Sequence, residues 1–212
     1  MFGAAGEAVE QTGIGAGLDA GLVREIFVPR AVQLAPLLSL ARGEIAYEAG
    51  RLDEARRTFA IAAGLGTEEL PHEASVEAHA YTGLLDGLAG GTEQGLSALR
   101  ASLERARAMG RHALEARCRL YMARIDIRRN RFAEALRTLN EIPADGDGGT
   151  IGRELRAHVH YWRAVALRGR GDAAGADAEH AAARKGLGDI RASLPDADRA
   201  AFDARPDIAA MR

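Results

Sequence analysis

Cysteine and lysine are nearly missing from this chain of 212 residues. Cys118 is the one cysteine, so the chain cannot form a disulfide bond within itself. Because Cys118 lies in an apolar helical pattern, we expect a small packed thiol and not a reactive one. Lys185 is the one lysine among 28 lysine and arginine residues. We attribute this excess of arginine to the base composition of the gene and not to phosphate recognition.

An excess of charge of one sign and long apolar runs are also lacking. The net charge is −2, which gives no support to nucleic-acid binding. No apolar run approaches the roughly 20 residues needed to cross a bilayer, and the N-terminus lacks the regions of a signal peptide. An apolar content of 47% argues against a disordered chain. We therefore expect a folded cytoplasmic protein that does not bind membranes, or a fragment whose location follows that of a longer parent.

Signatures of common enzymes are absent from the sequence as well. The chain has no phosphate-binding loop, no zinc-binding helix motif and no serine in a nucleophile elbow. A run that begins at Asp145 resembles a calcium loop, but Arg156 stands where that loop needs glutamate. His158 and His160 are about 200° apart around a helix, so they cannot share a metal ion. We therefore predict no catalytic residue, no metal site and no cofactor.

What the sequence does contain is a pattern that recurs about every forty residues. In each copy, a Gly or Asn is followed five positions later by a small residue, and four positions after that by a larger one. The four sets are Gly50, Ala55, Phe59; Gly90, Gly95, Leu99; Asn130, Ala135, Leu139; and Gly171, Ala176, His180. Antiparallel helices approach closely where small residues cross, and the larger residue should pack against the next pair. Such a period indicates stacked helix pairs.

The pattern predicts an all-α fold, because no segment alternates as a strand would. About four antiparallel helix pairs should stack into a right-handed superhelix, an α-solenoid, with helices over about 30–49, 52–64, 73–89, 92–109, 112–129, 131–141, 151–169 and 172–187. An extra short helix should end at Pro29, and Pro36 should kink the next helix or mark its start. Residues 68–72 and 143–150 should form connections without regular structure.

Three segments are expected along the chain. Residues 1–16 form a flexible or weakly helical lead, residues 17–187 form the helical repeat domain, and residues 188–212 form a capping tail. Pro195 and Pro206 should divide that tail into one or two short helices.

The repeated positions resemble those of the tetratricopeptide repeat (TPR) family. Its pattern has a small residue in the first helix, Gly or Asn at the turn, and Ala, an aromatic residue and a second Ala in the second helix. The matching sets are Gly43, Gly50, Ala55, Phe59 and Ala62; Ala123, Asn130, Ala135, Leu139 and Pro143; and Ala164, Gly171, Ala176, His180 and Ala183. The period of 40–41 residues exceeds the usual 34 or so, and the second copy is degenerate. The resemblance covers about residues 36–187 and implies a fold, not an activity.

The tail resembles the closing segment of helical-repeat regions in large bacterial signalling kinases and regulatory ATPases. The likeness lies between Leu194 and Pro206. It implies that the chain is a C-terminal sensing or scaffolding module whose catalytic parts lie elsewhere.

A binding groove should lie along the first helices of the pairs. Its candidate partner-binding residues are Glu44, Tyr47, Glu48, Tyr81, Arg117, Tyr121, Arg124, Arg128, His158, Tyr161, Trp162 and Arg168. Arginine and aromatic side chains suit an acidic or C-terminal peptide. The alternative is that Tyr81, Tyr121 and Trp162 only pack between helices. Because Glu44 stands where chaperone-binding TPR proteins need Lys or Asn, we do not predict binding of chaperone tails.

These observations favour a non-catalytic protein-interaction or scaffold module that binds a peptide or helix in its concave groove. The alternative is a ligand-sensing or autoinhibitory C-terminal module of a larger bacterial signalling kinase or ATPase. The expected partner is a protein or peptide, an acidic one among the candidates, and neither nucleic acid nor membrane. A homo-oligomer is compatible with the sequence.

Overall fold

Helices make up nearly all of the part of the chain that the structure describes. This computed structural model describes the backbone of residues 20–65, 73–143 and 151–211, and side chains from residue 34 onward within these ranges. The helices are α2 Ala20–Glu48, α3 Leu52–Gly64, α4 Glu73–Leu88, α5 Thr92–Ala108, α6 His112–Arg128, α7 Phe132–Asn140, α8 Arg153–Gly169, α9 Ala173–Ser193, α10 Asp196–Ala204 and α11 Pro206–Ala210. No strand occurs within these ranges, so the all-α prediction is confirmed.

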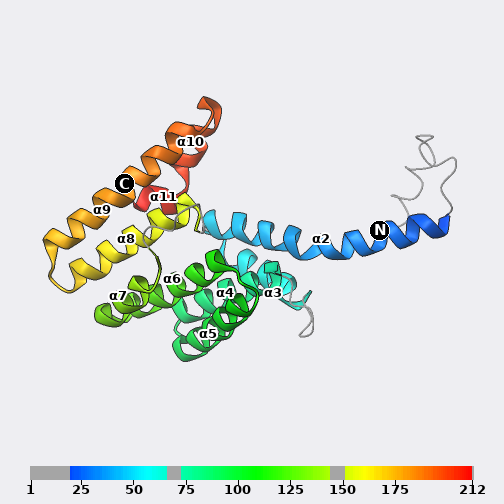
Figure 1. Cartoon of the computed structure of the whole chain (residues 1–212), viewed down its shortest axis with the longest axis horizontal. Helices are drawn as coiled ribbons and strands as arrows, with labels where there is room; N and C mark the ends of the chain where they lie inside the picture. The colour runs from blue at the N-terminus through cyan, green and yellow to red at the C-terminus, as the bar shows by residue number, and fades with distance from the viewer. Residues whose placement is uncertain (1–19, 66–72, 144–150, 212) are drawn as a thin grey trace.

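Helices that follow one another along the chain pack side by side from α2 to α9 (Figure 1). In addition, α2 contacts α4, α4 contacts α6, and α6 contacts α8. The first half of α2 extends away from this packed body (Figure 1). None of the described helices is both long enough and apolar enough to span a membrane.

The expected break at Pro29 was wrong, because α2 continues through both Pro29 and Pro36. A proline ring holds φ near the helical value and removes one backbone donor, so a helix can continue at the loss of that hydrogen bond. The prolines are two turns apart, and each disturbs a different turn. The expected lead at 1–16, the connection at 68–72 and most of the loop at 143–150 lie outside the described residues.

The turns between paired helices use the residues that the repeat predicts. The backbone angle φ is positive at Gly50 (72°), Gly90 (111°), Asn130 (59°) and Gly171 (86°). After each of these residues, a backbone N–H bonds back to the carbonyl five residues earlier, as from Arg51 to Ala46 at 2.8 Å. This bond is typical of a left-handed helix cap. Gly110, between α5 and α6, has the same conformation.

Small residues lie where the paired helices cross. Ala55, Ala135 and Ala176 are fully buried. A side chain on Gly95 would lie 2.5 Å from the carbonyl oxygen of Gly83, so glycine is needed at the crossing of α4 and α5. At this crossing, the small residue of the sequence pattern marks a close approach of one helix backbone to the other.

The larger residue of each set packs as predicted in three of the four copies. Phe59, Leu99 and Leu139 are fully buried, and Phe59 stacks on Tyr81 of α4, with ring centroids 4.4 Å apart. His180 differs, because it is half-buried and lies 6.3 Å from the ring of Tyr161 on α8.

Two apolar clusters hold the molecule together. The larger one extends from Leu40 to Ala166 and joins α2 to α8. The smaller one joins α8 and α9 to the tail and consists of Ala157, Leu187, Phe202, Ile208 and Met211. The two short tail helices confirm the division at Pro195 and Pro206. However, α9 continues to Ser193, past the expected domain boundary at 187.

Candidate functional site

The alternate helices α2, α4, α6 and α8 surround one hollow of about 490 Å³. Ten of the twelve residues predicted for the groove line it: Glu44, Tyr47 and Glu48 of α2, Tyr81 of α4, Arg117, Tyr121 and Arg124 of α6, and His158, Tyr161 and Trp162 of α8. Their spacings of three and four residues place each group on one side of its helix. The fold thus brings together residues that are more than a hundred positions apart in the sequence.

Two predicted groove residues lie elsewhere. Arg128 is the exposed last residue of α6. Arg168 is exposed near the end of α8 and forms an ion pair with Asp177 of α9 at 2.7 Å. Both follow the helical spacing of the groove residues, but they lie too far toward the turn to reach the hollow.

The tail contributes lining residues that sequence reasoning missed. Besides Ala113, Leu120, Gly152 and Leu155, the lining includes Glu154 of α8 and Arg205, Asp207, Ala210 and Met211 at the end of the chain. Glu154 precedes His158 by one helical turn, and this spacing could have revealed it. The tail residues carry no such signal, because their position depends on how α11 docks.

Arg117 is neutralised on one side of the hollow. Its Nη1 donates to Glu44 Oε1 at 3.1 Å and to the Tyr81 hydroxyl at 3.3 Å, and it forms an ion pair with Glu77. Burial raises the pKa of the Glu77 carboxyl, even though Arg117 opposes the shift. A guanidinium with two carboxylate partners has little charge left for a ligand.

Arg124 has a different environment, built from aromatic rings. Its Nη2 donates to the Tyr47 hydroxyl at 2.8 Å, and its guanidinium carbon lies 4.9 Å from the ring centroid of Trp162 and 5.9 Å from that of Tyr121. Its Nε is buried without a hydrogen-bond partner. Among the side chains that the structure describes, no carboxylate forms an ion pair with Arg124.

The aromatic residues of the hollow are of two kinds. Tyr81 and Tyr121 are 7% and 5% exposed, so they pack mainly between helices, as the alternative interpretation expected. Tyr47, Tyr161 and Trp162 are half-buried and present part of their rings to the hollow. Trp162 therefore differs in exposure from Tyr81 and Tyr121, with which the alternative interpretation grouped it.

Arg205 is the centre of an ion-pair network at the tail side of the hollow. Its Nη2 lies 2.6 Å from Glu154, 2.8 Å from Asp207 and 3.2 Å from Glu48. His158 Nε2 lies 3.4 Å from the same oxygen of Asp207 and 3.9 Å from Glu154. The network joins α2, α8 and the start of α11.

The pKa shifts of His158, Glu154 and Asp207 favour their charged forms, whereas burial raises the pKa of Glu48. Burial lowers the pKa of His158, but its bonds to Asp207 and Glu154 outweigh burial and raise it. Hydrogen bonding to His158 is the main reason that the pKa of Glu154 is lowered. Burial raises the pKa of Asp207, but His158 and Arg205 bring it below its usual range. These directions are typical of structural ion pairs and not of a poised general acid.

Glu154, His158 and Asp207 are also the candidate metal ligands of the described residues. One ligand atom from each lies within 4.8 Å of the others. Arg205, however, donates to the oxygens of Glu154 and Asp207 that approach His158. A cation therefore already lies between the carboxylates, and a metal ion would have to displace it.

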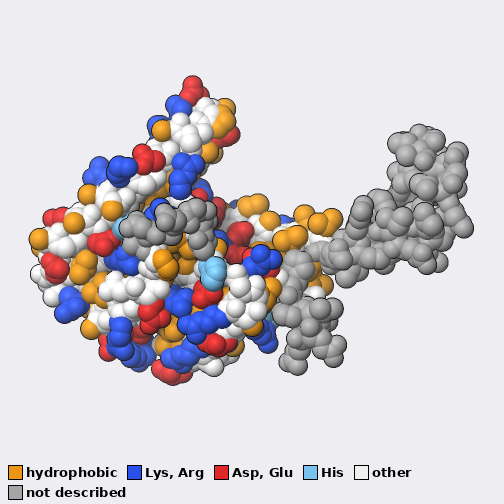
Figure 2. All heavy atoms as spheres, in the orientation of Figure 1, with side chains coloured by type: hydrophobic (Ala, Val, Ile, Leu, Met, Phe, Trp, Pro, Cys, Tyr) orange, Lys and Arg blue, Asp and Glu red, His pale blue; other side chains and the backbone are white. Residues whose placement is uncertain are grey.

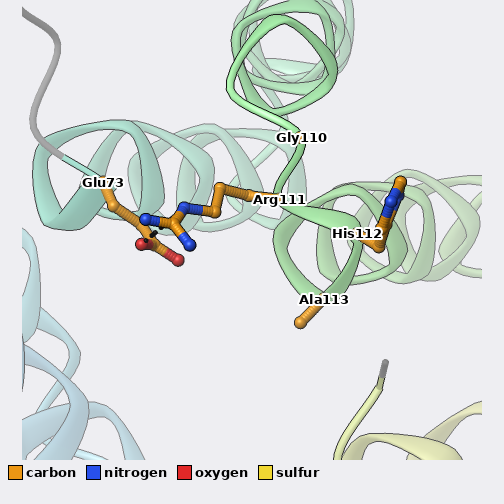
Figure 3. A pocket seen from close by; sticks show the side chains of 5 residues that line it. All are labelled: Glu73, Gly110, Arg111, His112 and Ala113. Atoms are coloured by element: carbon orange, nitrogen blue, oxygen red, sulfur yellow. Dashed lines mark ion pairs between the residues drawn. The ribbon is translucent and has the colours of Figure 1, made fainter. Parts of the chain in front are cut away.

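A second recess of about 250 Å³ lies where the start of α4 meets the turn between α5 and α6 (Figure 3). The Arg111 guanidinium points toward Glu73, and their ion pair is 3.0 Å long (Figure 3). His112 points away from this pair and lies 3.2 Å from Glu115. An ion pair between such exposed side chains contributes little energy, so this recess is a weak candidate for a site.

Two remaining reactive side chains have structural surroundings. Cys118 is fully buried, and burial raises the pKa of its thiol to about 12, which fits the expected packed thiol. His160 faces α9, where its Nδ1 lies 2.6 Å from Glu179. The two neighbouring histidines of α8 therefore face different sides, with only His158 at the hollow.

Comparison of the whole chain with protein-family models, with curated proteins and with solved structures found no match.

Proposed function

We propose that this chain is a non-catalytic, cytoplasmic protein-interaction module with a TPR-like architecture. In this proposal, about four helix pairs form a right-handed α-solenoid, with part of α2 as the extra N-terminal helix and α10 and α11 as the cap. The regular left-handed turns and the contacts among α2, α4, α6 and α8 support it. The concave side would hold a peptide or helix of a partner protein.

Arg124 is the observation that carries this proposal. It lines the hollow, its rotamer is held by rings from α2, α6 and α8, and it has spare donors. A guanidinium held in this way loses little side-chain entropy when it binds a carboxylate. The partner should therefore place one anionic group, an acidic side chain or a chain terminus, against Arg124.

The charge of the hollow limits how acidic the partner can be. Four carboxylates line it, from Glu44, Glu48, Glu154 and Asp207, against three arginines. A long acidic run would place like charges close together in a partly buried site, which is unfavourable. We therefore expect one anionic group beside apolar or aromatic residues, and not a polyacidic peptide.

Capture from a lysate with matched variants tests the proposal. The full chain serves as bait, and the partner it retains is titrated against wild type, Arg124→Gln and Arg128→Gln. We expect Arg124→Gln to weaken binding roughly tenfold or more, because a hydrogen bond to a charged group is lost. Arg128→Gln removes the same charge one turn further along α6, outside the hollow, and should leave affinity unchanged.

Trp162→Phe provides a second variant if Arg124→Gln reduces stability, which far-UV circular dichroism and thermal unfolding would reveal. This change retains an aromatic ring and reduces the contact between the indole and Arg124. Equal affinity of wild type, Arg124→Gln and Trp162→Phe for the retained partner would exclude the hollow as its binding site.

A second candidate function is sensing of a small molecule by a module of a larger signalling kinase or ATPase. The tail favours it, because Arg205, Asp207 and Met211 line the same hollow as the repeat helices. The volume of the hollow also lies in the range of small-molecule sites. Native mass spectrometry of the chain purified from its own host distinguishes the two functions. A retained small molecule supports sensing, and a retained polypeptide supports the interaction module.

A further inference from the structure

Exposed large apolar side chains are concentrated at one end of the molecule. Within the described residues they are Leu34, Leu37, Leu38, Ile45, Leu52, Ile61 and Leu65, all of which belong to α2, α3 or the position after α3. Leu38 and Ile45 are 65% and 61% exposed. Figure 2 shows apolar side chains along α2, between the packed body and the grey atoms. A terminal element of a helical stack needs a polar outer face to remain soluble by itself.

The exposed residues of α2 have the spacing of a coiled coil. Leu34, Leu38, Ala41 and Ile45 follow one another at intervals of four, three and four residues, and all four are exposed. This spacing keeps apolar side chains in one line that faces another helix. We call these four residues the seam. In the sequence, the same intervals continue back to residues 31 and 27, which are Ala and Phe.

The other side of α2 is already used by the fold. Pro36, Leu40 and Gly43 are buried there, and α2 packs against α3 and α4. Each of the exposed seam residues Leu34, Leu38 and Ala41 lies two positions from one of these. Two positions correspond to about 200° around a helix, so the seam is nearly opposite the packed face. A helix that is apolar on both sides is suited to burial between two partners.

We propose that a second copy of this chain covers the seam, through antiparallel pairing of the two α2 helices. A twofold axis between residues 39 and 40 places Leu38 against Ala41 of the second copy, and Leu34 against its Ile45. Large residues then meet small ones at the centre, as packed helices require. The same patch serves both copies, as in most homodimers.

Charge and shape also suit a second copy. Between residues 34 and 45 the charged residues are Arg42 and Glu44, so the pairing brings no block of like charges together. Glu44 is held on the other side by Arg117. Because the packed face of α2 lies nearly opposite the seam, antiparallel pairing places the two bodies on opposite sides of the helix pair. This interface does not include the hollow and stands independently of the proposed function.

The oligomeric state of the full chain tests this interface. Sedimentation equilibrium at about 10–100 µM should show a dimer for wild type. Leu38→Glu should weaken dimerisation by at least roughly 100-fold, because two copies of the side chain leave one interface. Ala101→Glu adds the same charge at an exposed position of α5 and should retain the dimer. Leu38 is exposed in the monomer, so the helical circular dichroism should not change.

Cysteine cross-linking tests the direction of pairing. The protein's own Cys118 is fully buried and should not interfere. An oxidised mixture of Leu34→Cys and Ile45→Cys chains should give a covalent dimer on a non-reducing gel, whereas Leu34→Cys alone should not. Cross-linking of Leu34→Cys alone would instead indicate parallel helices and overturn the arrangement.

Two results would overturn the proposal as a whole. One is a monomeric wild-type chain throughout this concentration range, which would leave the seam to a different protein or to a further repeat. The other is a dimer that persists unchanged in Leu38→Glu, which would place the interface elsewhere.

Discussion

His158 illustrates how a single residue acquires its role from its neighbours. The sequence pattern places His158 in the predicted groove, and the helical spacing puts His160 on a different side of the same helix. In the structure His158 lies against Asp207 and Glu154, with Arg205 beside both carboxylates. These contacts raise the pKa of His158, so its protonation is coupled to docking of the tail.

This coupling predicts a pH dependence of stability. A histidine whose pKa is raised by folding stabilises the protein fully below its unfolded pKa of about 6.5, and less as pH rises through the higher folded pKa. The thermal midpoint of wild type should therefore exceed that of His158→Gln most at about pH 5–6 and least above about pH 8. Thermal unfolding of both proteins at several pH values measures this difference.

His112→Gln is the matched control, because His112 is exposed and lies on α6 away from the tail. Its midpoint should follow that of wild type at every pH. The lowered pKa of Asp207 affects stability only at strongly acidic pH, so it does not alter the comparison. A His158→Gln difference that grew with pH would contradict the coupling.

At the scale of elements, the turns are the part of the fold that the sequence predicts best. Each predicted turn residue has a positive φ, a conformation that costs an ordinary L-residue roughly 1–2 kcal/mol. Asn130 is the one described residue other than glycine in this conformation. Asparagine tolerates it better than most residues, because its short polar side chain can bond locally.

We predict a clear order of stability at position 130. Asn130→Ala should lower the free energy of unfolding by about 1 kcal/mol, whereas Asn130→Gly should change it by about 0.5 kcal/mol or less. Urea unfolding monitored by circular dichroism measures both. Asn140→Ala is the control at an exposed helix end. Equal losses for Asn130→Ala and Asn140→Ala would exclude a special role of the turn.

At the scale of the whole molecule, the two apolar clusters imply unequal stability. The larger cluster extends over α2 to α8, whereas five buried residues hold α10 and α11 to α8 and α9. With only five residues, α11 is too short to be stable without this packing. The tail side of the hollow should therefore open more easily than its other sides.

Ile208→Ala should increase this inequality. Ile208 is fully buried, and loss of such a side chain costs about 2–5 kcal/mol. We expect hydrogen exchange to accelerate in α10, α11 and the end of α9, with little change in α3 to α6. Ile61→Ala, at a side chain that is 59% exposed, should leave exchange unchanged throughout. Uniform acceleration in Ile208→Ala would indicate one cooperative unit.

The sequence by itself determined the helical fold, the turns and about half of the residues around the hollow. These features depend on local rules, since glycine favours positive φ, small residues allow close crossings, and helical periodicity assigns one side to each group. Pro29 was misjudged by the same rules, because a helix can lose one hydrogen bond and continue.

Tertiary structure alone decided what each lining residue can do. Arg117, Arg124 and Arg205 look alike in sequence, but only Arg124 has no carboxylate partner among the described residues. Such pairing joins parts of the chain that are distant in the sequence, as between α2 and the residue before α11. No local sequence pattern encodes such pairing. Whether the charge of an arginine is already neutralised depends on carboxylates that only folding brings near.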